Sequence, residues 1–543
     1  MSSIKKCDAG IWAAIATGFL IIIYAPLETL FSNKNEFCFD LQLLLPYMLL
    51  TLAILLFPVC MIIICVEKKS RTLYKVLTIA SFVILLDFYI QGNFFVKNLP
   101  SLDGTLIDWS LYPGERIKSI IIIVILVVLA VAASKILGTD KLVSTIKYLS
   151  MGITCFLLIT ILMLAISTQG YRSKSQYTCT GHGMETFSTD LNFIIFVLDA
   201  TDGQCMKDLI ESDEHYAGIF KDFTFYTDTM GMYSFTEHSV PYILSGDTYE
   251  NDEDFNEYLD KAYTGEKSIV RRLYDQGYDV GVYETDMQIS GDNYAFIDNV
   301  MAYKKGVTDP IAFIRWNIQM GGFRYFPFDV KRICFVSPAA FLSIMKIPDG
   351  ESIFEHDNRD YYEELISREV SVTDKKCFKY TRILGSHVPW KYDEDLNDKE
   401  DAQYTDQMRS GLKVTEEYLD RLKSAGCYDD SIIIIMADHG YDTVGTDTMK
   451  RTNPILFIKG INEVHDIVVM NDERVSFEDL QRAYDDLLNG KQSTDLFNDI
   501  DPDRVRRYIY YEYLDEDHMY EYLQTGDARS WDTLTETGNR YFR

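Results

Sequence analysis

An acid, an imidazole and a glycine close the apolar stretch SIIIIMADHGYD, residues 431–442. The isoleucine run is short and β-branched, which is typical of a central strand covered on both faces. In open α/β sheets such strands present ligand-binding residues at their carboxyl ends. A carboxylate beside an imidazole is a metal-binding pair, so Asp438 and His439 are candidate metal ligands. A polar cap where the strand enters a loop is the alternative interpretation.

A second apolar run, LNFIIFVLDATDG at residues 191–203, also ends in an acid, Asp199. If both strands are central and parallel, their carboxyl ends share one edge of the sheet, and Asp199, Asp438 and His439 can converge there. An oxygen-rich site with one imidazole suits Mn²⁺ or Zn²⁺, with Mg²⁺ and Ca²⁺ as open alternatives.

Residues 229–247, TMGMYSFTEHSVPYILSGD, contain several hydroxyl groups before an expected helix. The helix is predicted to begin near Ser239, with Pro241 in its first turn. A hydroxyl just before a helix amino terminus lies beside free N–H groups and the positive end of the helix dipole, which suits phosphate or sulfate. Such a residue is a candidate nucleophile, and an ordinary Ser/Thr helix cap is the alternative.

Alternating strands and helices must position these residues. Further strands are predicted at residues 279–284, 377–384 and 454–460, and a helix at residues 401–426 that closes on Gly426. This alternation predicts a mostly parallel central sheet flanked by helices on both faces.

The first third of the chain carries long apolar runs. Five of them are long enough, or nearly so, to span a bilayer, which takes roughly 20 apolar residues: 11–31, 41–66, 73–95, 117–137 and 148–167. Lysines precede the first run, and lysines or arginines also occur in the connecting segments 67–71 and 138–147. These three segments are therefore expected in the cytoplasm. An odd number of spans then places everything after about residue 168 outside the plasma membrane.

Four parts are therefore expected: a five-helix transmembrane domain (1–167), a linker (168–190), an extracytoplasmic catalytic domain (191–498) and a small helical or mixed extension packed on it (499–543). The formal net charge of -29 belongs largely to the exported part. Such a field repels nucleic acid and anionic lipid headgroups at long range. Nucleic acid is therefore not an expected partner, and an anionic substrate would need local cations, such as a bound metal.

Four motifs follow one another in a characteristic order: a strand ending in Asp199, T-x-x-S-x-P at residues 236–241 before ILSG, GSH-x-P at residues 385–389, and DHG at residues 438–440. In this order they resemble the alkaline phosphatase and sulfatase superfamily. With five amino-terminal spans, the chain is similar to the membrane-anchored branch that contains lipoteichoic acid synthases and phosphoethanolamine transferases. The motifs cover residues 191–460, and the membrane part is similar by architecture only.

The resemblance implies a role for each matching residue. Asp199, Asp438 and His439 match metal ligands. Thr236 matches the nucleophilic threonine, which also contacts the metal, because a serine and a proline follow it three and five residues later as in the phosphoethanolamine transferases. His387 matches a histidine that faces the transferred group.

Two further positions need separate treatment. Relatives often place another histidine where this chain has Arg382, and Arg382 is expected either to bind an anionic headgroup or to be simply a surface residue. Ser239 lies in an S-x-P sequence, which some sulfatases use to present the Ser or Cys that becomes formylglycine. Those enzymes continue with an arginine where this chain has Ile243, so Thr236 is favoured as the nucleophile.

The resemblance implies a metal-dependent phosphotransferase that moves a phospho-headgroup from a phospholipid to an envelope glycan or lipid through a phosphothreonine-type intermediate. A membrane-anchored sulfuric or phosphoric ester hydrolase is the close alternative. A non-catalytic surface protein with a vestigial site is a third hypothesis.

Overall fold

The computed structural model describes residues 2–33, 37–95, 99, 107, 109–172, 177–249, 253–285, 289, 292–441, 451–511 and 518–542. The chain forms two compact units. The helical unit contains Met1–Gln176 and Tyr303–Lys346, and the α/β unit contains Tyr177–Ala302 and Ile347–Arg543. Residues 173–176 of the expected linker lie outside the described part. The rest of that linker after residue 176 already belongs to the α/β unit, where it forms β1 (Tyr177–Cys179) and β2 (Thr186–Ser188).

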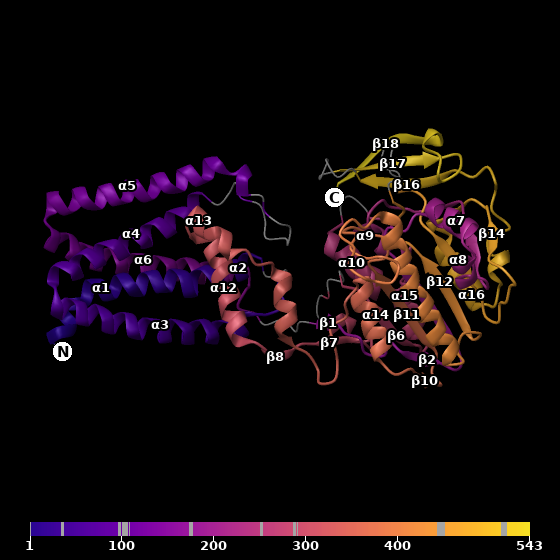
Figure 1. Cartoon of the computed structure of the whole chain (residues 1–543), viewed down its shortest axis with the longest axis horizontal. Helices are drawn as coiled ribbons and strands as arrows, with labels where there is room; N and C mark the ends of the chain where they lie inside the picture. The colour runs from indigo at the N-terminus through magenta and orange to yellow at the C-terminus, as the bar shows by residue number, and fades with distance from the viewer. Residues whose placement is uncertain are drawn as a thin grey trace. The chain divides into compact units, whose positions relative to one another are not determined.

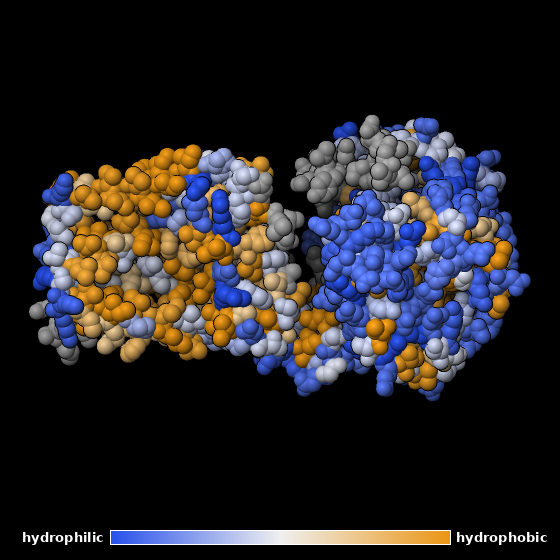
Figure 2. Space-filling model, viewed as in Figure 1, coloured by the Kyte–Doolittle hydropathy of each residue, from blue (hydrophilic) through white to orange (hydrophobic). Residues whose placement is uncertain are grey.

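Among the described residues, five helices are long and apolar enough to cross a membrane, as the sequence predicts: Asp8–Ser32, Leu41–Lys69, Arg71–Phe94, Pro113–Leu137 and Thr139–Ser167. The first comprises α1 (Ser2–Gly18), a π-helical turn (Phe19–Tyr24) and α2 (Ala25–Ser32), and the others are α3, α4, α5 and α6. Figure 2 shows apolar side chains over most of the visible face of these helices. The loop expected at residues 138–147 is wrong, because α6 begins directly after Gly138. The φ of 78° at this glycine allows the chain to turn between α5 and α6.

Residues 303–346, here called the docked segment, belong to the helical unit, although the sequence placed them within the catalytic domain. They form β8 (Lys304–Val307), α12 (Pro310–Tyr325), α13 (Phe328–Lys331) and β9 (Met345–Lys346), with β8 and β9 antiparallel. Helices α12 and α13 lie across one end of the spanning helices (Figure 1). Phe313, Met320 and Tyr325 are buried in the same apolar core as residues of α2 and α3. The apolar side chains of the segment are thus covered by the helices.

Polar contacts fix the docked segment in place. The Tyr325 hydroxyl donates a hydrogen bond to the Glu28 carboxylate of α2, and Arg324 lies 3.3 Å from the same carboxylate. At the start of α5, the Ser119 hydroxyl accepts a hydrogen bond of 3.1 Å from the backbone N–H of Phe328. Tyr325, Glu28 and Ser119 are buried, so removing one of these partners loses a buried hydrogen bond.

A fragment containing residues 177–543 is expected to remain in the membrane after the chain is cut at a protease site engineered between residues 172 and 177, because the docked segment stays packed in the helical unit. Gly92→Ala is expected to release that fragment, since the added Cβ would overlap the Tyr325 ring. Gly152→Ala is the matched control, because no described heavy atom lies within 4 Å of its Cβ. Immunoblotting of washed membranes makes the measurement. Loss of the unsubstituted fragment in the wash would contradict this packing.

The α/β unit is built on a seven-stranded sheet in the order β14-β4-β13-β12-β3-β11-β6. The bounds are β3 (Asn192–Leu198), β4 (Thr224–Tyr226), β6 (Asp279–Tyr283), β11 (Cys377–Ile383), β12 (Ser431–Met436), β13 (Leu456–Lys459) and β14 (Val469–Asn471). Strands β12, β3, β11 and β6 are parallel, while β13 is antiparallel to both of its neighbours. The predicted fold class, a helical membrane part followed by an α/β domain with a mostly parallel sheet, is confirmed.

The register of the parallel strands brings the candidate residues together. Val197 of β3 pairs with Met436 of β12, so the same register sets Asp199 level with Asp438 two residues later. All six residues of β12 are buried, as the isoleucine run predicts. The strands therefore form a rigid support whose shared edge carries the acids.

Helices cover this sheet (Figure 1): α7 (Gly203–Ser212), α8 (Glu214–Ile219), α9 (Thr236–Ser245), α10 (Phe255–Thr264), α11 (Ile269–Asp275), α14 (Asn358–Ser367), α15 (Tyr404–Ser424) and α16 (Leu480–Leu488). Short two-stranded pairs join β1 to β7 (Val300–Ala302), β2 to β10 (Ser371–Thr373) and β5 (Thr229–Met230) to β15 (Val475–Ser476). The predicted helix at residues 401–426 corresponds to α15.

The described residues of the C-terminal extension contain no α-helix. It forms a three-stranded antiparallel sheet of β16 (Arg506–Tyr511), β17 (His518–Gln524) and β18 (Leu534–Phe542). Its alternating tyrosines suit strands, which accounts for the difference from the expected helical or mixed structure. The Ile509 N–H donates to the Met232 carbonyl at 2.8 Å, and the Ser234 N–H donates to the Ile509 carbonyl at 3.2 Å. The extension thus supports the loop that leads into α9.

Candidate active site

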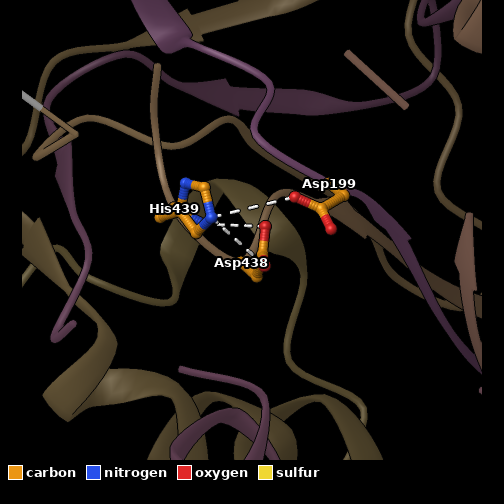
Figure 3. A group of neighbouring side chains, drawn as sticks. All are labelled: Asp199, Asp438 and His439. Carbon is orange, nitrogen blue, oxygen red and sulfur yellow. Dashed lines mark hydrogen bonds and ion pairs between the residues drawn. The ribbon is translucent and has the colours of Figure 1, made fainter. Parts of the chain in front are cut away.

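Asp199, Asp438 and His439 meet at the carboxyl edge of the sheet (Figure 3). All three side chains are buried, and one ligand atom from each lies within 4.8 Å of the other two. His439 Nε2 is 3.8 Å from Asp199 Oδ1 and 3.6 Å from Asp438 Oδ2. Three residues from two strand ends, separated by more than two hundred positions in the chain, thus form one compact group of possible metal ligands.

The ring of His439 is oriented for metal binding. Its Nδ1 lies 2.8 Å from the Gly440 carbonyl oxygen, which can only accept a hydrogen bond, so Nδ1 carries the proton. The lone pair of Nε2 is then directed toward the two carboxylates. Burial lowers the pKa of His439, with Asp438 opposing this effect and Arg451 adding to it. A neutral imidazole is the form that coordinates a metal.

The Asp438 carboxylate is held by the backbone. Its Oδ1 accepts hydrogen bonds from the N–H groups of Ala200 (3.1 Å) and His439 (3.0 Å), which leaves Oδ2 directed at the imidazole. Burial acts to raise the pKa of Asp438, but His439 and Arg382 outweigh it, and the pKa lies below its ordinary value. Ala200 has a φ of 54°, a left-handed conformation that costs a non-glycine residue roughly 1–2 kcal/mol. This backbone conformation directs the Ala200 N–H toward the Asp438 carboxylate.

Gly385 makes room for the main chain at Asp199. A Cβ at Gly385 would lie 2.6 Å from the Asp199 nitrogen, and its φ is 54°. The Ser386 N–H donates to the Asp199 carbonyl at 2.9 Å. The glycine of the GSH motif therefore allows the loop after β11 to lie directly against the residue that carries the first acid.

Thr236 lies beside this group. Its Oγ1 is 3.5 Å from Asp199 Oδ2 and 3.5 Å from His439 Nε2, and the residue is half-buried. Helix α9 begins at Thr236, three residues before the predicted start, and Phe235 occupies the N-cap position. Thr236 is therefore not an ordinary helix cap. Its hydroxyl lies at the amino end of a ten-residue helix, where the dipole favours negative charge.

Ser239, the alternative nucleophile, faces away from solvent. It is fully buried, and its hydroxyl donates a 2.5 Å hydrogen bond to the Asp438 carbonyl oxygen. Ser239 therefore supports the loop that holds Asp438, while Thr236 is the accessible hydroxyl.

Arg382 is not a surface residue. Its side chain is 2% exposed, and one guanidinium nitrogen lies 2.6 Å from Asp199 Oδ2. Its other two nitrogens bind both oxygens of Glu284, each at 2.6 Å. Arg382 thus joins Glu284 and Asp199 across three neighbouring strand ends, in the bidentate geometry that guanidinium groups favour. The predicted contact of Arg382 with a substrate stays a prediction.

The sequence contains a signal for Glu284. The predicted strand DVGVYE ends in this acid, just as two other strands end in Asp199 and Asp438. Thr381 pairs with Tyr283, so the next two residues, Arg382 and Glu284, are level on neighbouring strands. The rule that parallel strands share one functional edge would therefore have placed Glu284 at the same edge of the sheet as Asp199 and Asp438.

His387 lies on the loop after β11 and is half-buried. Its Nδ1 is 2.6 Å from the Val388 carbonyl oxygen. It follows Gly385 by two residues, and Gly385 lies directly against the main chain of Asp199. The hydrogen bonds of the described residues do not join His387 to Thr236, so its predicted role in facing the transferred group stays a prediction.

The donor set is suited to a divalent ion. Two carboxylates, an imidazole nitrogen and a nearby hydroxyl are the ligands that Mn²⁺ and Zn²⁺ accept. A buried group of two ionised acids and a neutral histidine also needs a cation to offset its charge. Arg382 provides one positive charge to Asp199 and Glu284 together, so the group remains negative.

The fold and the site place this protein in the class of α/β proteins with a possible metal site at the ends of parallel strands. Residues 192–471, just over half of the chain, match the family model described as Sulfatase. The chain belongs to the sulfatase family, which confirms the relationship expected from the four motifs. A comparison with curated proteins finds no match.

Solved structures with a related fold include a protein of the alkaline phosphatase superfamily from Vibrio parahaemolyticus, at 12% identity and a TM-score of 0.37, over 68% of this chain and 81% of that one. BT1596, a 2-O GAG sulfatase, matches at 12% identity and a TM-score of 0.34, over 62% and 83%. The C-terminal periplasmic domain of EcEptC from Escherichia coli matches at 10% identity and a TM-score of 0.32, over 67% and 96%.

Proposed function

We propose that this protein is an extracytoplasmic, metal-dependent phosphotransferase that takes a phospho-headgroup from a membrane phospholipid and transfers it to an envelope glycan or glycolipid. The position of Thr236 is the observation that carries the proposal. Its hydroxyl is half-buried and lies 3.5 Å from both Asp199 and His439, at the amino end of α9. An accessible hydroxyl next to a candidate metal group is what a nucleophile of this chemistry requires.

Asp199, Asp438 and His439 would hold the divalent ion, which supplies Lewis-acid stabilisation of the phosphoryl oxygens and of the Thr236 oxygen. In the first step, Thr236 Oγ1 forms a bond to phosphorus while the bond from phosphorus to the diacylglycerol oxygen breaks. Thr236 loses its proton, and the departing diacylglycerol oxygen gains one. The N–H groups at the start of α9 face the same region and favour the phosphate charge.

In the second step, the hydroxyl of the acceptor attacks the phosphothreonine ester. A new bond from phosphorus to the acceptor oxygen forms, the bond to Thr236 Oγ1 breaks, and the threonine oxygen regains a proton. His387, on the loop after β11, is proposed to exchange protons with the leaving or attacking oxygen. The five spanning helices would keep this unit at the membrane, where the lipid donor lies.

Ester hydrolysis is the second candidate, and the match to the sulfatase family model favours it. It differs from transfer only in the second step, where water replaces the acceptor hydroxyl. The same residues of this chain would bind and orient the substrate in both cases.

The full-length protein in liposomes with a headgroup-labelled phospholipid and an envelope extract separates these functions. Transfer predicts diacylglycerol with the label in glycan or glycolipid, and hydrolysis predicts diacylglycerol with the label in a water-soluble product. Removing divalent ions with a chelator is expected to stop both, and adding back Mn²⁺ or Zn²⁺ to restore them. If a fully metal-loaded protein forms no diacylglycerol from any envelope phospholipid, the proposed donor class is wrong.

A further inference from the structure

The docked segment is basic in a strongly acidic chain. Residues 303–346 contain seven lysines and arginines but only two acids, whereas the whole chain has a net charge of -29. Lys305, Arg315, Arg332 and Lys346 are exposed. A concentration of positive charge on an otherwise negative protein indicates a surface that meets an anionic partner.

The outer face of α12 combines charge with exposed apolar side chains. Phe313, Asn317 and Met320 are buried against the spanning helices. On the opposite face Ile311 is 78% exposed, and it is followed one turn later by Arg315. Positions three and four residues apart share one face of a helix. A face with isoleucine and arginine suits the boundary between lipid and water better than bulk water.

The rest of the segment repeats this combination. Ile333 is 73% exposed beside the exposed Arg332, whose guanidinium lies 6.0 Å from the Trp109 ring and 5.9 Å from the Phe328 ring. Tryptophan and arginine with an apolar neighbour are typical of the level of the lipid headgroups.

The segment lies at a defined level of the helices. It contacts Glu28 near the end of α2 and Ser119 near the start of α5. Both positions are at the opposite end of the helices from the basic turn at Lys68 and Lys69, which joins α3 to α4. The docked segment is therefore at the end predicted to meet the outer leaflet, so its positive charge is not explained by cytoplasmic orientation.

An apolar groove lies between the spanning helices and reaches α12. It has a volume of about 390 Å³ and runs between α1, α3 and α4, where Gly18, Leu55 and Ile84 contribute to its lining. Ile318 of α12 also lines it. Arg315 precedes Ile318 by three residues, so the two positions lie on the same side of α12.

We propose that the docked segment binds an anionic phospholipid of the outer leaflet, with an acyl chain in the groove and the phosphate at Arg315 and the neighbouring basic residues. The charge of the segment selects the headgroup, and the groove accepts a chain. The inference rests on the helices lying in a bilayer and is independent of the chemistry at Thr236. It also explains how a chain whose overall charge repels anionic headgroups can approach them, because the repulsion is reversed locally where the helices end.

Lipid retention by the full-length protein tests the proposal. The protein is extracted with a bilayer-retaining polymer from membranes containing equal amounts of phosphatidylglycerol and phosphatidylcholine, and the retained lipids are counted by mass spectrometry. Phosphatidylglycerol is expected to be enriched about fivefold or more, as several basic groups at a surface imply. The quadruple variant Lys305→Gln, Arg315→Gln, Arg332→Gln and Lys346→Gln is expected to lose this enrichment.

The matched control removes the same number of exposed or half-exposed charges from the α/β unit: Lys207→Gln, Lys221→Gln, Lys267→Gln and Lys376→Gln. It is expected to keep the enrichment. Ser81→Phe, which fills the groove, is expected to reduce the total lipid retained while the remaining lipid keeps its preference for phosphatidylglycerol. Resistance to protease of the helical unit, in which Tyr325 is buried, confirms that each variant is folded.

Three results would overturn the proposal. One is an equal content of both lipids in the unsubstituted protein. Another is the same loss of enrichment in the control quadruple variant, which would assign the effect to overall charge. The third is loss of binding to soluble polyphosphate in the segment variant without any change in retained lipid, which would assign the segment to a polyanionic polymer.

Discussion

Thr236→Ala is expected to lower kcat for diacylglycerol formation at least about a thousandfold, because removing a nucleophile eliminates the covalent step rather than weakening it. Thr236→Ser keeps a hydroxyl at the start of α9 and is expected to retain measurable turnover. Binding of Mn²⁺ or Zn²⁺, followed by calorimetry, is expected to persist in Thr236→Ala, since Asp199, Asp438 and His439 remain.

Ser239→Ala is the matched control for this prediction. Its hydroxyl donates to the Asp438 carbonyl, so the substitution removes one buried hydrogen bond, worth about 1 kcal/mol. A loss of no more than about tenfold in kcat is therefore expected. The opposite pattern, with turnover surviving Thr236→Ala and disappearing in Ser239→Ala, would show that the wrong hydroxyl has been assigned.

Arg382→Met is expected to destabilise the α/β unit by about 3–5 kcal/mol, because it leaves the carboxylates of Glu284 and Asp199 buried without their common partner. Chemical denaturation of the full-length protein, followed through the α/β unit, measures the change. Arg359→Met is the control: this arginine lies 2.9 Å from Asp398, but the two side chains are 35% and 79% exposed. Such an exposed pair is worth about 1 kcal/mol or less.

A second variant separates charge balance from general disruption. The double variant Arg382→Met with Glu284→Gln removes one of the two uncompensated charges and is expected to recover part of the lost stability. Metal affinity is expected to fall in both variants, since Arg382 holds Asp199 through Oδ2 and leaves Oδ1 toward His439. We infer that Arg382 is a positioning residue. Unchanged metal affinity in a folded Arg382→Met protein would refute that role.

The sequence predicts the elements of the site better than their contacts. The isoleucine run of β12 and the apolar run of β3 are short and β-branched, which favours buried strands, and parallel strands share a functional edge, so Asp199 and Asp438 could be placed together. The pairing of Arg382 with Glu284 depends on strand order, because β11 lies between β3 and β6. No local pattern encodes that order, so Arg382 was open between a headgroup contact and the surface.

Tertiary packing decides the other differences. Strand β13 follows β12 closely and pairs with it antiparallel, which an apolar run alone does not specify. Helix α9 begins early because Phe235 occupies its N-cap position. Sequence patterns expect a hydroxyl or acidic residue at that position, so they do not predict this start. The docked segment has a composition that fits an amphipathic helix in either unit. Only its packing against α2 and α5 shows where it belongs.

The docked segment also sets an order for the biosynthesis of the protein. The five spanning helices emerge from the ribosome first, yet the helical unit lacks part of its core until residues 303–346 arrive. Those residues are made only after β3, β6 and α9 have been synthesised. Because domains generally fold as units during synthesis, completion of the membrane part waits for synthesis of the chain that contains Asp199 and Thr236. A translational pause or truncation before residue 346 would therefore leave an unfinished anchor that membrane quality control can recognise.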